Sequence, residues 1–218
     1  MDFWQPIDLY CERLSSAFWA EPFNAISNLS MIIAGLWGFI LIKKIEVSHK
    51  SLRLWIMILS VNALIIGTGS FLFHTFANQW SLFADVIPIT LFMVLYLGFA
   101  LRYFLSWKTP AVAASLMAFL LTGVALDHFL PKGFLNGSGT YLHAFIVLVL
   151  MSFCLNHFHQ KPLAKILGLA TLVFLVSLIF RSIDLWACPH FSAGTHFIWH
   201  TLNGGLLSIC IYSLTYLK

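Results

Sequence analysis

Long apolar runs, separated by short polar stretches, fill almost the whole chain. A helix that crosses a bilayer needs about 20 mostly apolar residues, and seven runs come close to this length. They cover approximately residues 24–42, 53–73, 84–104, 110–127, 140–157, 163–182 and 196–216. This pattern predicts an all-α fold, namely a polytopic membrane protein built as a seven-transmembrane helix bundle.

The polar stretches between these runs are too short to hold a separate soluble domain. We therefore expect a single domain over residues 1–218, in which residues 1–23 form an extramembrane N-terminal segment. The composition agrees, because 60% of the residues are hydrophobic and only 9% are charged. So few charged side chains cannot cover the surface of a soluble protein.

Lysine and arginine fall unevenly on the two sides of the predicted bundle. Nine lie on one side and three on the other, namely Lys43, Lys44, Lys50, Arg53, Arg102, Lys108, Lys161, Lys165 and Lys218 against Arg13, Lys132 and Arg181. Because cytoplasmic loops collect basic residues, the N-terminus is predicted to lie outside and the C-terminus in the cytoplasm. The formal net charge of +4 then reflects topology and not nucleic-acid binding. We expect a multi-pass protein of a plasma or bacterial inner membrane.

Five polar side chains sit near the predicted outer ends of three spans. His196 and His200 are one helical turn apart, Ser70 and His74 have the same spacing, and Asp85 follows in the next span. Residues at positions i and i+4 share a helix face, and the predicted topology places all five in the outer third of the bilayer. Ionisable groups at such depth are costly, roughly 2.5 to 3.5 kcal/mol for an aspartate at mid-bilayer, and usually mark a functional site.

These residue types match a hydrolytic metal centre. Three histidines with one open position form the ligand set of a catalytic zinc. A carboxylate such as Asp85 can orient and deprotonate the bound water, and a hydroxyl such as Ser70 can donate to a developing oxyanion. The alternatives are unrelated core histidines, a serine bonded back to its own helix, and an exposed aspartate at a helix start.

The same residues belong to longer segments that form a recognisable pattern. The segments are Tyr10-Cys11-Glu12, Phe18-Trp19-Ala20-Glu21-Pro22-Phe23-Asn24, Gly69-Ser70-Phe71-Leu72-Phe73-His74 with Asp85 and Pro88, Arg181-Ser182-Ile183-Asp184, and His196-Phe197-Ile198-Trp199-His200. The pattern resembles the alkaline ceramidases, and the chain looks like a bacterial-type member. It is shared more loosely with the seven-helix superfamily of adiponectin and progestin receptors and glycolipid-anchor remodelling hydrolases.

This resemblance implies an intramembrane zinc-dependent lipid amide hydrolase. His74, His196 and His200 would hold Zn2+, Asp85 would activate the bound water, and Ser70 would help stabilise the tetrahedral intermediate. Zinc-bound hydroxide would attack the amide carbonyl of a ceramide that enters from the bilayer, which yields a sphingoid base and a free fatty acid. Three alternatives remain open: a receptor-like or lipid-sensing member of the superfamily, a hydrolase of another N-acyl lipid, and a bis-histidine haem protein.

The resemblance also implies two features of the N-terminal segment. One is a disulfide between Cys11 and Cys188, both on the predicted oxidising side, with two free thiols as the alternative. The other is a Ca2+ site, in which Glu12 and Glu21 match family ligands and Asp8 stands one position early. Calcium needs six to eight oxygens, and an acidic cluster at a helix start is the alternative.

Four further ionisable residues near the predicted outer side do not belong to the predicted metal centre. Arg181 and Asp184 are expected to form an ion pair that shapes the entrance to the site, because they lie about one turn apart. Asp127 and His128 are interpreted as a pair that caps the end of the fourth span. No role is assigned to His143.

Overall fold

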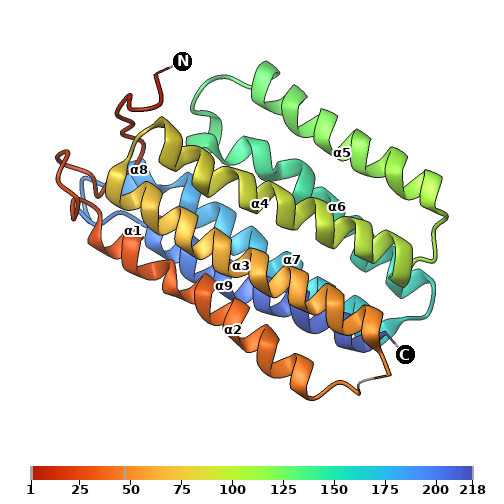
Figure 1. The fold of residues 1–218 in the computed structure, drawn as a ribbon. Helices are drawn as coiled ribbons and strands as arrows, with labels where there is room; N and C mark the ends of the chain where they lie inside the picture. Colours follow the sequence, from red (N-terminus) through yellow and green to blue (C-terminus); the bar gives the residue numbers. More distant parts are fainter. Residues whose placement is uncertain (1, 47, 218) are drawn as a thin grey trace.

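Seven helices in the described part of the chain are long and apolar enough to cross a membrane. The structure is a computed structural model that describes residues 2–46 and 48–217 (Figure 1). Lys218, one of the nine basic residues counted above, lies outside the described residues. The all-helical seven-span architecture predicted from the apolar runs is confirmed.

The helices follow one another in the order of the predicted spans. Their bounds are α1 Pro22–Ser27 and α2 Leu29–Lys43, α3 Lys50–Phe76, α4 Gln79–Phe99 continued by the π-helical η1 Ala100–Phe104, α5 Thr109–Phe129, the 3-10 turns η2 Phe134–Tyr141 followed by α6 Leu142–His157, α7 Lys161–Ser182, the short α8 Asp184–Ala187, and α9 His196–Ser213 with η3 Leu214–Tyr216.

Several helices extend beyond the apolar runs. Local backbone signals set the residues at which they begin and end. Helix α3 stops where Ala77 adopts the left-handed conformation, with φ of 42°. The next helix begins at once, because the Asn78 side chain accepts a hydrogen bond from the Ser81 amide in a capping box. This tight turn places the last part of α3 directly beside the first part of α4.

Helices α3 and α9 occupy the middle of the bundle, and α5 lies at its edge (Figure 1). Helix α3 packs against α2 and α4, and α9 packs against α2 and α7. Helix α5 buries only Val112 and Phe119. The two central helices are therefore the ones that can hold polar groups away from lipid.

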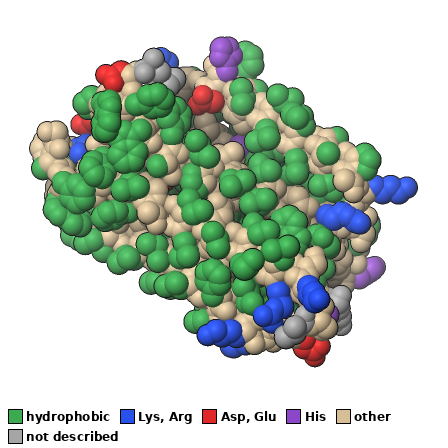
Figure 2. All heavy atoms as spheres, in the orientation of Figure 1, with side chains coloured by type: hydrophobic (Ala, Val, Ile, Leu, Met, Phe, Trp, Pro, Cys, Tyr) green, Lys and Arg blue, Asp and Glu red, His purple; other side chains and the backbone are tan. Residues whose placement is uncertain are grey.

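The two ends of the bundle differ in chemistry. His74, His196 and His200 lie at the end that also carries the N-terminal segment, here called the histidine end. Helix ends rich in lysine and arginine lie at the opposite end, here called the lysine end, and Figure 2 shows a group of these side chains there. Which of the two ends faces the outside of a membrane stays a prediction from the charge distribution.

Close backbone contact between α3 and α4 depends on Gly69. A Cβ atom at this position would collide with the backbone carbonyl of Ala84, next to Asp85. At Gly205, by contrast, an added Cβ would meet no atom within 4 Å. Glycine at position 69 therefore allows the approach that brings Ser70 and Asp85 onto facing helices.

Gly69→Ala is expected to push α3 away from α4 and to lower the free energy of unfolding by about 1–3 kcal/mol, the usual cost of overpacking. Gly205→Ala is the matched control and should be neutral or slightly stabilising, because alanine favours helix more than glycine. Thermal unfolding of the detergent-solubilised protein measures both. Equal stability of the two variants would contradict the close packing at Gly69.

Candidate metal centre

Three buried histidines from two helices meet at the histidine end. His74 lies in the last turn of α3, while His196 and His200 share one face of the first turns of α9. Their exposed fractions are 0%, 1% and 1%. One ring nitrogen from each lies within 4.8 Å of the others. The structure thus brings together the three side chains that the spacing singled out.

Two of these rings are held through their Nδ1 atoms. His74 Nδ1 lies 2.6 Å from Glu21 Oε2, and His200 Nδ1 lies 2.9 Å from Ser27 Oγ and 3.0 Å from the Asn24 carbonyl oxygen. Metal-ligating histidines are commonly oriented in this way through their second nitrogen.

Other ring nitrogens of the cluster have no hydrogen-bond partner among the described residues. These are His74 Nε2 and His196 Nδ1, both of which are buried. Unpaired polar atoms inside a protein are costly unless a ligand satisfies them. The donor set, its burial and its unpaired nitrogens therefore fit a bound metal ion.

Ser70 and Asp85 lie beside this cluster. Ser70 is one turn before His74 on α3, and Asp85 lies on α4 next to Ala84, whose carbonyl Gly69 approaches closely. Both side chains are buried. The Asp85 Oδ1 atom is buried without a partner in the described chain. All five side chains singled out in the sequence therefore lie buried at the histidine end.

Residues of the N-terminal segment cover the cluster. The Tyr10 ring stacks on His196, with ring centroids 3.6 Å apart. Burial raises the pKa of Tyr10 to about 12, so its hydroxyl stays neutral near physiological pH. Residues 3–7 run along the turn between α3 and α4, where the Ile7 amide donates to the Ala77 carbonyl. The segment that precedes the first span thus forms a wall of the site.

The acidic residues considered for calcium have separate surroundings. Asp8 is exposed, while the Glu12 carboxylate accepts hydrogen bonds from the Phe23 and Asn24 amides at the start of α1. Burial raises the pKa of Glu12 and outweighs these bonds. Within the described chain, His74, His196 and His200 form the only group of three His, Cys, Asp or Glu side chains that could hold a metal ion. The structure does not bring Asp8, Glu12 and Glu21 together in this way.

Glu21 instead forms a buried charge cluster. Its carboxylate is bonded to the Arg13 guanidinium and to His74, and it accepts a hydrogen bond from the Asn24 side-chain amide. Burial opposes ionisation of Glu21, but its interactions with His74, Asn24 and Arg13 hold the pKa below its usual value. Arg13 also donates to the His74 carbonyl. An ionised carboxylate is therefore fixed against the outer face of His74.

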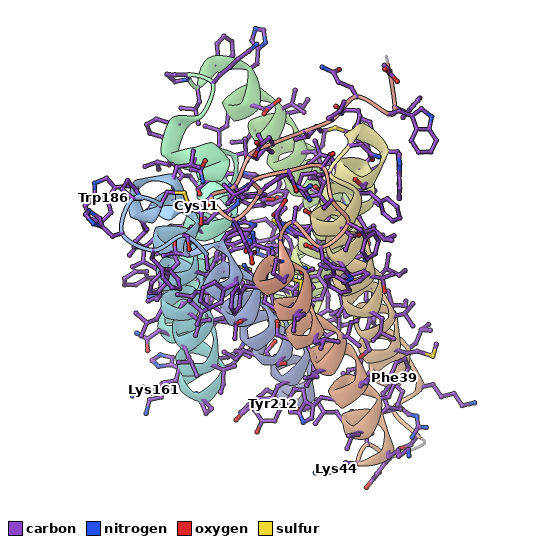
Figure 3. The ribbon with its side chains drawn as sticks, turned by 90° about the vertical axis from the view of Figure 1, so that its left-hand side faces the viewer. Cys11, Phe39, Lys44, Lys161, Trp186 and Tyr212 are labelled. Carbon is purple, nitrogen blue, oxygen red and sulfur yellow. A yellow bond between two sulfur atoms is a disulfide. The ribbon has the colours of Figure 1, made fainter. Side chains whose placement is uncertain are left out.

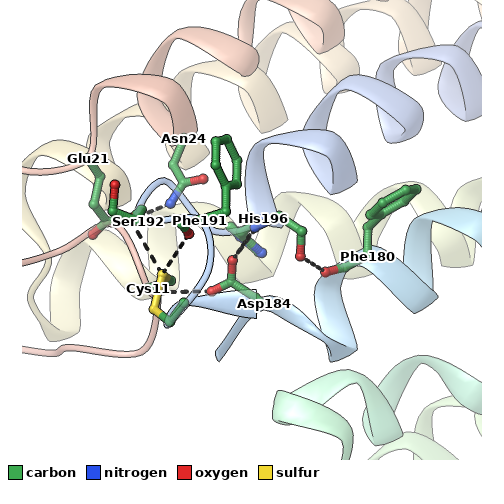
Figure 4. Close-up of a disulfide and its surroundings, with 10 residues drawn as sticks. Cys11, Glu21, Asn24, Phe180, Asp184, Phe191, Ser192 and His196 are labelled. Atoms are coloured by element: carbon green, nitrogen blue, oxygen red, sulfur yellow. Dashed lines mark hydrogen bonds between the residues drawn. A yellow bond between two sulfur atoms is a disulfide. The ribbon is translucent and has the colours of Figure 1, made fainter. Parts of the chain in front are cut away.

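The disulfide between Cys11 and Cys188 is confirmed, and it joins positions 177 residues apart in the sequence (Figure 4). Figure 3 shows Cys11 at the same end of the molecule as Trp186, far from Lys44 and Lys161. The bond ties the N-terminal segment to the loop that precedes α9.

The expected ion pair between Arg181 and Asp184 is wrong. The buried Asp184 carboxylate accepts hydrogen bonds from the backbone amides of Cys11, Thr195 and His196 at 2.7–2.9 Å (Figure 4). It therefore fixes the start of α9 at His196, the first histidine of the pair. The end of the loop after α8 and the start of α9 supply two of these donors, and the N-terminal segment supplies the third, which spacing within one helix could not reveal.

Arg181 has aromatic and backbone partners instead. Its guanidinium group donates to the Asn136 carbonyl and the Tyr10 hydroxyl, and it packs over the rings of Tyr10, Tyr141 and Trp199. Such packing of a cation on aromatic faces is favourable when both are shielded from water. Arg181 thus links η2, α7, α9 and the N-terminal segment.

Comparison with protein families agrees with this arrangement. The family model described as Ceramidase matches residues 7–218. The chain belongs to this family. A comparison with curated proteins found no match. Membership makes the chain a membrane hydrolase that acts on an amide C–N bond, and the resemblance noted in the sequence is confirmed.

Sequence reasoning missed several residues that hold the site of this ceramidase. Asn24, Ser27 and Tyr10 were not assigned a role, although all three lie in the N-terminal part of the chain that carries the family pattern. Glu21 was considered as a calcium ligand, whereas the structure places it against His74. Polar residues just before an apolar span were the available signal, but their partners are distant in the sequence.

Glu21→Gln is expected to weaken metal binding about 10- to 100-fold, because the neutral amide no longer supports His74 through a charged hydrogen bond. Competition with a chelating dye measures the affinity of the purified enzyme for Zn2+. Glu46→Gln is the control, since Glu46 is exposed near the lysine end. Unchanged affinity in Glu21→Gln would contradict the role of Glu21 as a support for His74.

Cys188→Ser is expected to lower the free energy of unfolding by about 2–4 kcal/mol, because the cross-link restricts the unfolded chain. Cys154→Ser should have little effect, since Cys154 is an exposed free cysteine. Thermal unfolding with and without reductant measures this difference. If reductant destabilised the wild type and Cys188→Ser equally, the disulfide would not be the stabilising feature.

Proposed function

We propose that this ceramidase is a zinc-dependent enzyme that cleaves the amide of ceramide within the membrane. One observation supports this most strongly: three buried histidines converge at the end of the bundle where Asp85 and Ser70 lie, and nitrogens of His74 and His196 have no partner among the described residues. Family membership supplies the substrate class. The products are a sphingoid base and a free fatty acid.

The donor set favours zinc among the common divalent ions. Neutral imidazoles suit Zn2+, whereas Ca2+ and Mg2+ prefer oxygen ligands. His74, His196 and His200 would hold the ion. When bound, zinc supplies a Lewis acid that lowers the pKa of a water molecule and polarises a carbonyl group. Tyr10 and the N-terminal segment limit access of bulk water to the cluster.

Asp85 has the position of a general acid and base. Its buried Oδ1 atom has no partner in the described chain and can accept a proton from the attacking water. As the C–N bond breaks, the same carboxyl group can return this proton to the nitrogen of the departing sphingoid base. Burial among helices keeps the proton on this path instead of losing it to bulk water.

Ser70 can assist by stabilising the carbonyl oxygen of the amide. Its hydroxyl is buried on the face of α3 that carries His74. A hydroxyl donor at this position would favour the oxygen on which negative charge develops. Glu21 and Asn24 contact the rings of His74 and His200, and Asp184 accepts a hydrogen bond from the His196 amide. These contacts keep the three histidines in place.

Asp85→Asn is expected to retain about one zinc per chain but to lose about 10²- to 10⁴-fold in kcat, the usual range for loss of a general acid–base group. Released fatty acid from a ceramide in detergent, with metal content by elemental analysis, measures both quantities. Asp127→Asn is the matched control, because Asp127 is an exposed aspartate at the histidine end.

The double variant His74→Ala/His200→Ala is expected to lose both zinc and turnover. Substantial activity in this variant would contradict a histidine-bound metal centre. Stoichiometric zinc without hydrolysis of any ceramide would favour a lipid-sensing function instead. Hydrolysis of other N-acyl lipids in preference to ceramide would change the substrate assignment, and a Soret band would indicate haem.

A further inference from the structure

An apolar cavity lies inside the bundle next to the metal centre. Its lining begins at Trp199, which precedes His200 on α9, and at Ile89, which is one turn beyond Asp85 on α4. Helices α4, α6 and α9 supply most of the other lining residues. These three helices all run from the histidine end toward the lysine end, so the cavity extends away from the cluster along the bundle axis.

The cavity is long enough for one lipid tail. The lining on α9 extends from Trp199 to Cys210, which corresponds to roughly 16 Å at the rise of an α-helix. Half of the hydrocarbon core of a bilayer is about 15 Å thick, and one tail fills this depth in each leaflet. The cavity therefore matches a tail of about 14 to 16 carbons.

Three buried side chains close the deep end. Leu97 on α4, Met151 on α6 and Cys210 on α9 are the last lining residues of their helices. One turn further along the same helices come Leu101, Leu155 and Leu214, which belong to the packed core and do not line the cavity. We call Leu97, Met151 and Cys210 the cavity floor.

Two polar side chains on the cavity wall are already bonded to other groups of the protein. Asn203 donates to the Ser177 hydroxyl and the Trp199 carbonyl, and the Tyr96 hydroxyl is bonded to Ser213. The wall thus offers few free partners for the hydroxyl groups of a sphingoid base, whose burial without hydrogen bonds would be costly. An acyl tail has no such groups beyond its carbonyl.

We infer that this cavity holds the acyl tail of the substrate and that the floor sets an upper limit on the length of that tail. The inference rests on the proposed function, because the amide must lie at the histidine cluster for the tail to enter the cavity. It assigns a specificity role to residues on the far side of the cavity from the reacting atoms.

The floor selects by exclusion and not by added affinity. Lipid tails are about as apolar as the leucines that line the cavity, so transfer of a methylene from membrane to cavity gains little free energy. A tail that is too long, however, must displace packed side chains around the floor, and overpacked cores resist this. Turnover should therefore vary little for shorter tails and then fall sharply.

The experiment measures kcat/KM of the zinc-loaded enzyme for ceramides that share one sphingoid base and carry acyl tails of about 8 to 24 carbons. For the wild type, kcat/KM should change less than about threefold up to about 16 carbons and fall at least about tenfold by about 22 carbons. Met151→Ala removes part of the floor and should move this fall about three carbons higher, the length of the lost side chain. Cys210→Phe should move it lower.

Leu150→Ala is the matched control, because Leu150 precedes Met151 on α6 but is 56% exposed. It should keep the wild-type length limit. Turnover of the shortest ceramide and thermal unfolding show that each variant is folded. Met151→Ala alone decides the case if Cys210→Phe fails to fold.

The outcomes separate the inference from the proposed function. A length limit that Met151→Ala leaves unchanged would overturn the inference, although hydrolysis itself would still support the proposed function. The same holds if the limit depends on the length of the sphingoid base and not on the acyl tail. If the zinc-loaded wild type hydrolyses no ceramide of any length, the proposed function fails.

Discussion

Burial of three imidazoles inside a lipid-facing bundle is the constraint that organises this protein. Each ring carries two nitrogens that need partners in a medium of low dielectric constant. Glu21, Ser27 and Asn24 satisfy Nδ1 atoms of His74 and His200. His74 Nε2 and His196 Nδ1 remain without a partner among the described residues. The arrangement is therefore polar on its outside and able to bind metal on its inside.

The N-terminal segment exists in its observed form because of this constraint. His74 Nδ1 needs a hydrogen-bond partner in this buried position. Glu21 performs this task, and Arg13 balances its charge in the interior. The disulfide and Asp184 then fix the segment to the start of α9. A chain segment outside the apolar spans thus becomes part of the candidate metal centre.

The contrast between the two sides of the cluster explains how one site can act on a lipid. Toward the histidine end lie charges, amides and a disulfide, whereas toward the lysine end lies an almost wholly apolar cavity. An amide bond with a polar group on one side and a hydrocarbon tail on the other matches this division. In the proposed function, the reacting carbonyl would lie at this boundary, near Ser70 and Asp85.

The sequence by itself determined the seven spans, because about 20 apolar residues can be satisfied in lipid only as a helix. It also determined that His196 and His200 share a helix face, as do Ser70 and His74, since positions i and i+4 do so wherever the helix lies. Tertiary structure decided what surrounds them. Glu21 meets His74 across 53 residues, and Asp184 binds the amides of Cys11 and His196 instead of pairing with the nearby Arg181. Local spacing encodes the face of a helix, but the partner of a buried charge is set by which distant backbone folds against it.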